Sequence, residues 1–359
     1  MRIIKGAASR IRIVTAYVLV CIFGLMTLAS CGDTKVVLTT GFGKGEVFVI
    51  GDEVCTLPEV MVYLTNIQNS YESVYGSEIW NASLDGVSLE DNVKDTVLAR
   101  IAQVKTMYLM AKNRGIELTA GEEGLIQSAA ERYYSSLNET EKELLGIDKD
   151  TLAKMYREYA LADKVYESVI KDINPEISDD EARFVKVQYI FFRTSVHDGA
   201  GKLITFSDSE KANVAGKVAD VRQFATTGAY SFEDLAVKYS DSEEYERTFG
   251  KGEVSYELEQ AAFSLSTGEI SEPVETSEGF YLLKCISTLD REQTDANKIA
   301  IVEKRQQEAF ETQYNEFVET LVRNLNDQLW DEVSLLHDER VNTSDFFDVY
   351  NETFGSING

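Results

Sequence analysis

One ordered stretch, from Phe184 to Ser287, constrains the fold more than any other part of the chain. It opens with the strand-like run FVKVQYIFF, continues with SFEDLAVKYS, and closes with ELEQAAFSLSTGEISEPVETSEGFYLLKC. Long segments with helical periodicity precede and follow it. The pattern predicts an α+β chain in which a small α+β module is inserted between helical segments, rather than two alternating α/β lobes.

The first 30 residues have the organisation of an export signal. Basic residues precede an apolar run at 13–28, and small residues follow it, as in a secretory signal peptide. Cys31 comes directly after Leu-Ala-Ser, which resembles a bacterial lipobox. We therefore expect a lipoprotein signal peptide at 1–30, a lipid on Cys31, a flexible tether at 31–45 and a globular part held outside the cytoplasmic membrane. The alternative is an uncleaved anchor, because the apolar run is nearly long enough to span a bilayer.

The chain is strongly acidic, with 61 Asp and Glu against 35 Lys and Arg and a formal net charge of −26. Removal of residues 1–30 takes away four basic and no acidic residues, so the mature net charge is about −30. Such a surface favours solubility and repels phosphate backbones and anionic lipid. We expect no binding to nucleic acid, and a preference for neutral or basic partners.

Few residues suit metal or nucleophilic chemistry. Outside the signal and its lipobox only two cysteines remain, Cys55 and Cys285, in strand-like segments of different expected domains. We interpret them as small buried apolar residues, with a disulfide as the alternative. The two histidines, His197 and His337, lack Cys, Asp or Glu neighbours at metal-ligand spacing. We expect no metal site, no cofactor and no Ser-His-Asp triad.

The segment 46–175 has the pattern of a mostly helical domain. Thr56 and Glu59 have the form of a capping box, and apolar residues at 3.6-residue spacing follow until Gly115. Pro175 ends the series, because the residue before a proline disfavours the helical conformation. The expected elements are two short strands at 46–54 and helices at 57–76, 93–115, 120–137 and 150–173.

Helical periodicity returns after the central module. An apolar stripe runs through the segment 291–335 and consists of Phe310, Tyr314, Phe317, Leu321 and Leu325. We expect a helix there that packs this stripe against the N-terminal helical segment. A dimer seam is the alternative, although the heptads are too few and too polar for a coiled coil. The tail at 336–359 either adds a strand or stays mobile, and its pattern does not decide between the two.

The central module resembles the parvulin family of peptidyl-prolyl isomerases. Ser231–Ala236 matches a helix of that family. Leu258–Phe263 and Gly268–Val274 match the stretch that closes the family's proline pocket and enters its last strand. The resemblance implies a four-stranded antiparallel sheet with helices at 176–290. The flanking helical segments resemble those of exported parvulin foldases and periplasmic survival chaperones, in which one helical chaperone domain is formed by N- and C-terminal parts.

The resemblance also assigns candidate site residues. The family's two histidines fall on tyrosines and its Asp or Cys falls on a serine: Tyr189, Tyr281 and Ser242, with Asp241 beside the last. The residues of the apolar proline pocket fall on Phe249, Val254 and Leu258. The connection between Ser242 and Phe249 is several residues shorter than in the family and lacks its Gly-Gly-Asp-Leu-Gly run.

Prolyl isomerisation requires no nucleophile or cofactor, because its barrier of about 20 kcal/mol is amide double-bond character. An enzyme lowers it by binding the proline ring in an apolar pocket while polar groups stabilise the twisted amide. Two tyrosine hydroxyls can rebuild the hydrogen-bond network of two histidines.

The leading hypothesis is therefore a membrane-tethered extracytoplasmic folding factor that isomerises Xaa-Pro bonds in unfolded or partly folded exported polypeptides. The loss of both family histidines keeps a second hypothesis open, a catalytically inactive parvulin-fold holdase. A third, a solute-binding lipoprotein, would need two alternating α/β lobes. The oligomeric state does not follow from the sequence.

Overall fold

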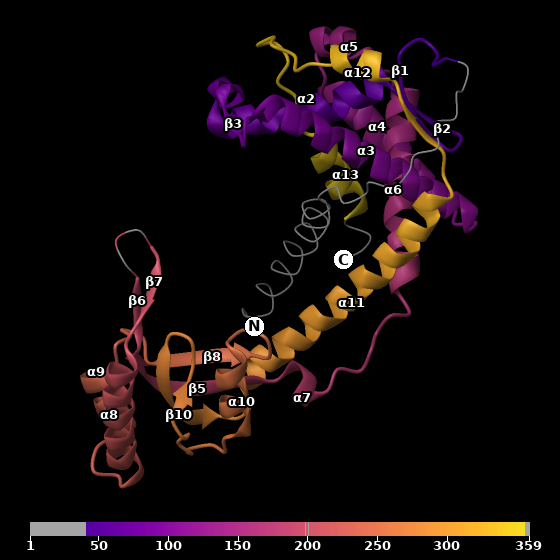
Figure 1. The fold of residues 1–359 in the computed structure, drawn as a ribbon. Coiled ribbons are helices and arrows are strands. Elements are labelled where there is room, and N and C mark those ends of the chain that lie inside the picture. Colours follow the sequence, from indigo (N-terminus) through magenta and orange to yellow (C-terminus); the bar gives the residue numbers. More distant parts are fainter. Residues whose placement is uncertain (1–40, 198, 200, 356–359) are drawn as a thin grey trace, which may run out of the picture. The chain divides into compact units, whose positions relative to one another are not determined.

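The computed structural model describes residues 41–197, 199 and 201–355, and the chain forms two compact units (Figure 1). One unit is helical and combines residues up to Val169 with those from Phe310 onward; the other spans Ile170–Ala309 and contains a four-stranded antiparallel sheet. The predicted α+β fold, with a split helical domain and an inserted sheet domain, is confirmed. The expected signal peptide and Cys31 lie outside the described residues. In the part that is described, no helix is both long enough and apolar enough to cross a membrane.

The helical unit follows the predicted series closely. Its first helix begins at the expected capping box of Thr56 and Glu59, and the next long helices begin at Ser88 and at a second capping box, Thr119 with Glu122. Its helices are α2 (Leu57–Tyr75), α3 (Leu89–Asn113), α4 (Ala120–Ser136), α5 (Glu139–Leu145), α6 (Lys149–Ile170), α12 (Asp327–Glu332) and α13 (Phe346–Phe354), with a 3-10 turn η1 (Ser77–Asn81). Its strands are β1 (Glu46–Ile50), β2 (Glu53–Thr56) and β11 (Arg323–Leu325), in the order β11-β1-β2, and a short hairpin of β3 (Ser83–Leu84) and β4 (Val87–Ser88).

The C-terminal segment differs from the expectation in two places. The helix α11 (Arg291–Glu319) ends well before residue 335, and the chain then adds β11 to the edge of β1. Phe310 is buried and packs against Tyr166 with ring centroids 4.9 Å apart, so it belongs to the core. The tail contains the helix α13, so it neither adds a strand nor is irregular throughout. Its Phe346 stacks on Tyr156 at 4.6 Å, a contact between residues far apart in sequence that no local pattern specifies.

The sheet unit extends on both sides of the expected 176–290. The first half of α11 contacts the segment that precedes the sheet: Lys298 pairs with Asp179 of α7, and the Gln306 amide donates to the carbonyl of Ile173 at 2.9 Å. The helices are α7 (Asp179–Ala182), α8 (Asp208–Thr226), α9 (Phe232–Tyr239) and α10 (Tyr256–Ser264). The strands β8 (Glu246–Gly250), β5 (Phe184–Arg193), β10 (Gly279–Ser287) and β9 (Val274–Glu275) lie in that order, and β6 (Ser195–His197) pairs with β7 (Leu203–Thr205) as a separate hairpin.

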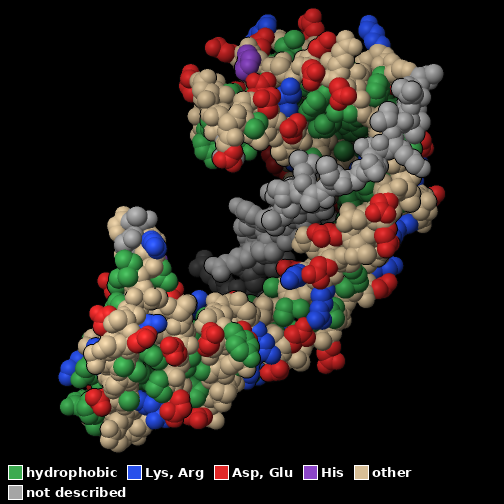
Figure 2. All heavy atoms as spheres, in the orientation of Figure 1, with side chains coloured by type: hydrophobic (Ala, Val, Ile, Leu, Met, Phe, Trp, Pro, Cys, Tyr) green, Lys and Arg blue, Asp and Glu red, His purple; other side chains and the backbone are tan. Residues whose placement is uncertain are grey.

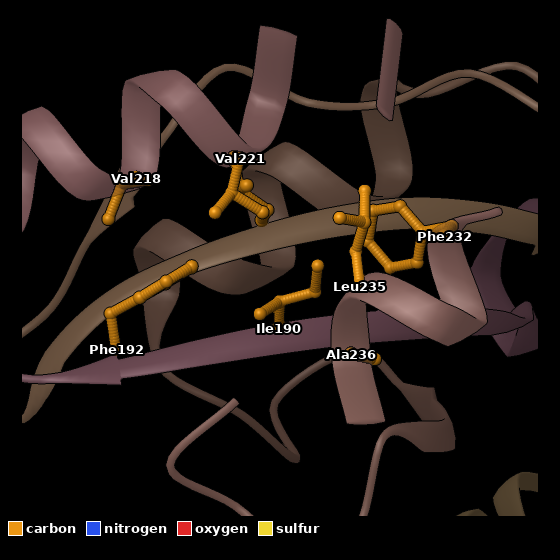
Figure 3. Packing of buried hydrophobic residues seen from close by; sticks show 8 residues of the cluster. Ile190, Phe192, Val218, Val221, Phe232, Leu235 and Ala236 are labelled. Carbon is orange, nitrogen blue, oxygen red and sulfur yellow. The ribbon is translucent and has the colours of Figure 1, made fainter. Parts of the chain in front are cut away.

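Alternation along β5 divides the sheet into two differently covered faces. On one face Ile190 and Phe192 are buried against α8 and α9, and Figure 3 shows their side chains directed toward Val218 and Leu235. On the opposite face a second cluster, which includes Val185 and residues of β10, packs beneath α10. The residues of β5 that are odd-numbered therefore share the face of α10.

Gly279 begins β10 and is the one glycine on which the central strand pair depends. A Cβ at this position would lie 2.1 Å from the backbone oxygen of Phe192, closer than atoms can approach. Only glycine lets β10 lie against the end of β5 in this register, which pairs Gly279 with Arg193.

Two further features bear on the predictions. Cys55 and Cys285 are free and fully buried, as interpreted from their strand-like context. Acidic side chains are spread over the surface that Figure 2 shows, in keeping with the formal net charge of −26.

Candidate functional site

A cavity of about 260 Å³ opens on the α10 face of the sheet. Six of the seven residues predicted for the site line it: Tyr189, Tyr281, Ser242, Asp241, Phe249 and Leu258. The seventh, Val254, does not; it is half-buried and packs against the apolar cluster around Phe249. The structure therefore gathers residues from β5, β8, β10, α10 and the segment after α9 at one place.

The two tyrosines meet because of the strand register. β5 and β10 are antiparallel, with Tyr281 opposite Phe191 and Leu283 opposite Tyr189, so both tyrosines lie on the same face as diagonal neighbours. Their ring centroids are 6.0 Å apart. Phe191 lies closer to Tyr281, at 4.6 Å, and contributes a third aromatic ring that the sequence comparison did not assign.

A serine-rich turn after α9 fixes the polar side of the cavity. Ser240 accepts hydrogen bonds from the backbone amides of Phe191, at 3.1 Å, and Ser242, at 3.2 Å. The Ser242 hydroxyl in turn lies 3.4 Å from the hydroxyl of Tyr189. Asp241 is exposed, and its carboxylate accepts from the backbone amide of Arg193 at 2.9 Å. Asp241 therefore holds the end of β5 in place, and Ser242 is the member of the pair that contacts a tyrosine.

The floor of the cavity is apolar. Four side chains from three strands and α10 form it: Val187, Leu283, Phe249 and Leu258. The first three are buried, whereas Leu258 is partly exposed. Binding of an aliphatic ring such as that of proline to this surface is favourable, because each Å² of apolar area removed from water contributes about 25 cal/mol of free energy.

Charged residues that sequence reasoning missed lie at the rim. Arg193, Arg247 and Glu278 all line the cavity and are exposed. Burial of Tyr281, together with the nearby negative charge of Glu278, raises the pKa of its hydroxyl to about 12, and Arg247 opposes that shift. The hydroxyl of Tyr281 is therefore neutral at physiological pH. No short motif marks the rim residues, because the pairing of β8 and β10 with β5 brings them together.

The shortened connection between Ser242 and Phe249 leads almost directly into β8. Glu243 and Glu244 in it are exposed, and the carbonyl of Tyr245 accepts from the backbone amide of Tyr189 at 2.8 Å. The few residues present are thus enough to close the sheet edge beside the cavity.

Comparison with known families agrees with this geometry. Residues 190–287 match the model of the rotamase family, described as the PPIC-type PPIase domain. They are a parvulin-type rotamase domain. The chain is 28% identical over 273 residues to the foldase protein PrsA of Caldanaerobacter subterraneus subsp. tengcongensis, an alignment that covers 75% of this chain and 81% of that protein. It is 41% identical over 76 residues to the peptidyl-prolyl cis-trans isomerase pin1 of Schizosaccharomyces pombe, which covers 20% of this chain and 43% of that protein.

Among solved structures, that of PrsA from Bacillus cereus matches with 15% identity and a TM-score of 0.32, over 75% of this chain and 97% of that one. That Tyr189 and Tyr281 stand at the positions of the family's two histidines stays a prediction from the sequence resemblance.

Proposed function

We propose that this protein is a lipid-anchored extracytoplasmic folding factor whose parvulin domain isomerises Xaa-Pro bonds in unfolded exported polypeptides. One observation carries the catalytic part: an apolar floor and three hydroxyl-bearing side chains, Tyr189, Tyr281 and Ser242, line the same cavity, and the hydroxyls of Tyr189 and Ser242 lie 3.4 Å apart. The name of a relative, foldase protein PrsA, supports a role in protein folding, and the expected export signal supports exported polypeptides as the substrates.

The cavity suits the reaction in size and in polarity. The proline ring binds on Phe249 and Leu258, which places the amide bond toward the tyrosines. As the bond twists, amide conjugation is lost and the nitrogen becomes a hydrogen-bond acceptor. A neutral hydroxyl can donate to it without bringing a charge into the apolar site, and this interaction exists only in the twisted state, as transition-state stabilisation requires.

A second function, that of a holdase without catalysis, is favoured by the chemistry of the same site. No histidine lines the cavity among the residues that the structure describes. In that case the parvulin domain would bind proline-containing segments in the cavity without accelerating their exchange.

The rate of cis-trans exchange in short Xaa-Pro peptides separates the two functions. We expect the full chain to accelerate exchange, measured by magnetisation-transfer NMR, and Tyr189→Phe with Tyr281→Phe to lower that rate about tenfold or more. Tyr256→Phe is the matched control, since Tyr256 is 72% exposed on α10 and lies outside the cavity lining. No acceleration by a folded chain would leave the holdase as the function.

The anchor is tested separately. With Cys31→Ser the protein should leave the membrane fraction of expressing cells, because a lipid can no longer be attached. Continued membrane retention would favour an uncleaved apolar anchor at 13–28 instead.

A further inference from the structure

The end of α2 and the residues that follow it form an exposed arm of the helical unit, residues 71–91. Most of its residues are exposed, including large apolar ones: Val74 is 70% exposed and Tyr75 is 65% exposed. At the end of the helical unit that Figure 1 labels β3, Figure 2 shows hydrophobic side chains at the surface beside acidic ones. Contiguous exposed apolar surface on a soluble protein marks a place where something binds.

The arm holds its aromatic rings in fixed positions. The indole of Trp80 donates to the carboxylate of Glu72 at 2.7 Å, which ties η1 back to α2. The ring of Trp80 lies 5.9 Å from that of Tyr71, and Tyr71 lies 6.3 Å from Tyr75. Rings held in this way lose little conformational entropy when a partner covers them, which favours binding.

A tight hairpin closes the arm. Asp85 and Gly86 both have positive φ, at 53° and 86°, the geometry of the two-residue turn that joins β3 to β4. The exposed Val87 follows the turn directly. The hairpin base is tied to α3 by a hydrogen bond from the amide of Leu89 to the carbonyl of Ala82 at 3.0 Å.

The charged residues of the arm are all acidic. From Lys44 to Lys94 the sequence contains no other Lys or Arg, and the arm carries five carboxylates: Glu72, Glu78, Asp85, Glu90 and Asp91. None of them forms an ion pair with any residue that the structure describes. Lys94, the nearest basic residue in sequence, lies 5.6 Å from the ring of Trp330.

The opposite holds on α4 of the same unit. There Glu122 pairs with Lys164, Glu123 with Arg157 and Glu131 with Lys149. These three carboxylates of α4 are therefore neutralised by ion pairs, whereas the five of the arm are not, among the described residues.

We propose that the arm 71–91 is a docking surface for basic, apolar segments of unfolded polypeptide. Arginine and lysine side chains would lie over the rings of Tyr71, Tyr75 and Trp80 and beside carboxylates that form no ion pair with a described residue, while apolar side chains cover Val74 and Val87. This inference rests on the proposed folding role and assigns it a binding surface apart from the isomerase cavity.

The chain supplies its own reporter for a test. It has two tryptophans, Trp80 on the arm and the buried Trp330, so Trp330→Phe leaves Trp80 as the only indole. The probe is an unstructured, proline-free peptide of repeated Arg-Leu-Gly-Ser, and its partner replaces each Arg by Glu. Without proline, neither peptide is a substrate for the cavity. We expect the arginine peptide to shift the emission of Trp80 to shorter wavelength and the glutamate peptide to leave it unchanged.

Two variants test the apolar and the charged part of the surface. Val74→Ser with Tyr75→Ser should weaken binding of the arginine peptide about tenfold, as for residues at the centre of an interface. Val237→Ser with Tyr256→Ser is the matched control, since those side chains are 73% and 72% exposed on the other unit. Glu78→Gln with Asp85→Asn should weaken binding about threefold and flatten its salt dependence, whereas Glu131→Gln, a paired carboxylate, should not.

Equal affinity for both peptides, equal weakening by the control pair, or binding without a change in Trp80 emission would overturn the proposal. Failure of the folding role is a separate result: the full chain would then neither accelerate Xaa-Pro exchange nor slow the aggregation of an unfolded protein, whatever the arginine peptide does.

Discussion

The two faces of the β5–β10 strand pair are made from alternating residues of the same strands, yet they serve different purposes. Even-numbered residues such as Ile190 and Phe192 are covered completely by α8 and α9. Odd-numbered residues face α10, which covers Val185 and Val187 but leaves Tyr189 and Tyr281 only partly buried at the cavity. The face covered by two helices, α8 and α9, is thus a packed core, whereas the face covered by α10 alone leaves room for a binding site.

The difference implies that stability and activity can be changed independently. On the closed face a side chain is surrounded by partners, so a change in its volume is felt as a change in stability. On the open face the cavity already provides space, so a change there should alter binding and rate before it alters folding.

The largest expected effect is on the closed face. Phe192 is 1% exposed, and Phe192→Ala should lower the free energy of unfolding of the sheet unit by about 3–5 kcal/mol, since it removes buried contacts and leaves a cavity. Denaturant unfolding followed by hydrogen exchange of the β5 amides measures it. Phe224→Ala on α8 is the control, because Phe224 is 38% exposed, and it should cost far less. Equal losses from both would mean that this face is not the core.

The family resemblance assigned Tyr189 and Tyr281 to one site, and the structure shows both in the lining of one cavity. The helices of the N-terminal segment could also be predicted from the sequence, because their capping residues and apolar spacing are local features. These are features that neighbouring residues determine.

Features that depend on contacts between residues far apart in sequence could not be predicted from local patterns. α8 was not predicted: it buries only Val218 and Val221 of its own residues, which gives a weak periodic pattern. α13 forms because Phe346 fits among aromatic rings of α2, α4 and α6. Arg247 reaches the cavity only through the pairing of β8 with β5.

On the open face, the next largest effect concerns pH. The pKa of Tyr281 lies at about 12, above the value of about 10 for an unfolded tyrosine. Its contribution to stability is therefore complete below pH 10 and is lost as the pH rises toward 12. Exchange catalysis should then be independent of pH between about 6 and 9, where this hydroxyl stays neutral.

Tyr281→His should give the site a pH dependence that the tyrosine lacks. We expect the exchange rate to fall about tenfold as the imidazole is protonated near pH 6.5, because Glu278 beside this position stabilises the charged ring and that charge enters the cavity whose floor binds the proline ring. Exchange rates across this pH range measure it for both proteins. A wild-type rate that already titrates near pH 6.5 would contradict the assignment of the tyrosines.

A smaller effect is expected where the open face meets α10. Leu258 is partly exposed, so Leu258→Ala should cost only about 1 kcal/mol of stability while it removes part of the surface that holds the proline ring. We expect KM for an Xaa-Pro peptide to rise several-fold with kcat nearly unchanged. Val254→Ala, beside the cavity but not in its lining, is the control for KM. A change in kcat alone would mean that Leu258 does not hold the substrate.

The smallest effect isolates one charge at the rim. Glu278 raises the pKa of Tyr281, after burial, so Glu278→Gln should lower that pKa while leaving the closed face untouched. Because Glu278 is exposed, solvent screens its charge, and the shift should be less than about one pH unit. Titration of ¹³C-labelled tyrosine, with Tyr281→Phe to identify the resonance, measures it. The same substitution should not change the denaturant midpoint at pH 7, where the Tyr281 hydroxyl is neutral in both proteins. A shift in that midpoint as large as that of Phe192→Ala would show that the two faces are coupled and would remove the distinction between them.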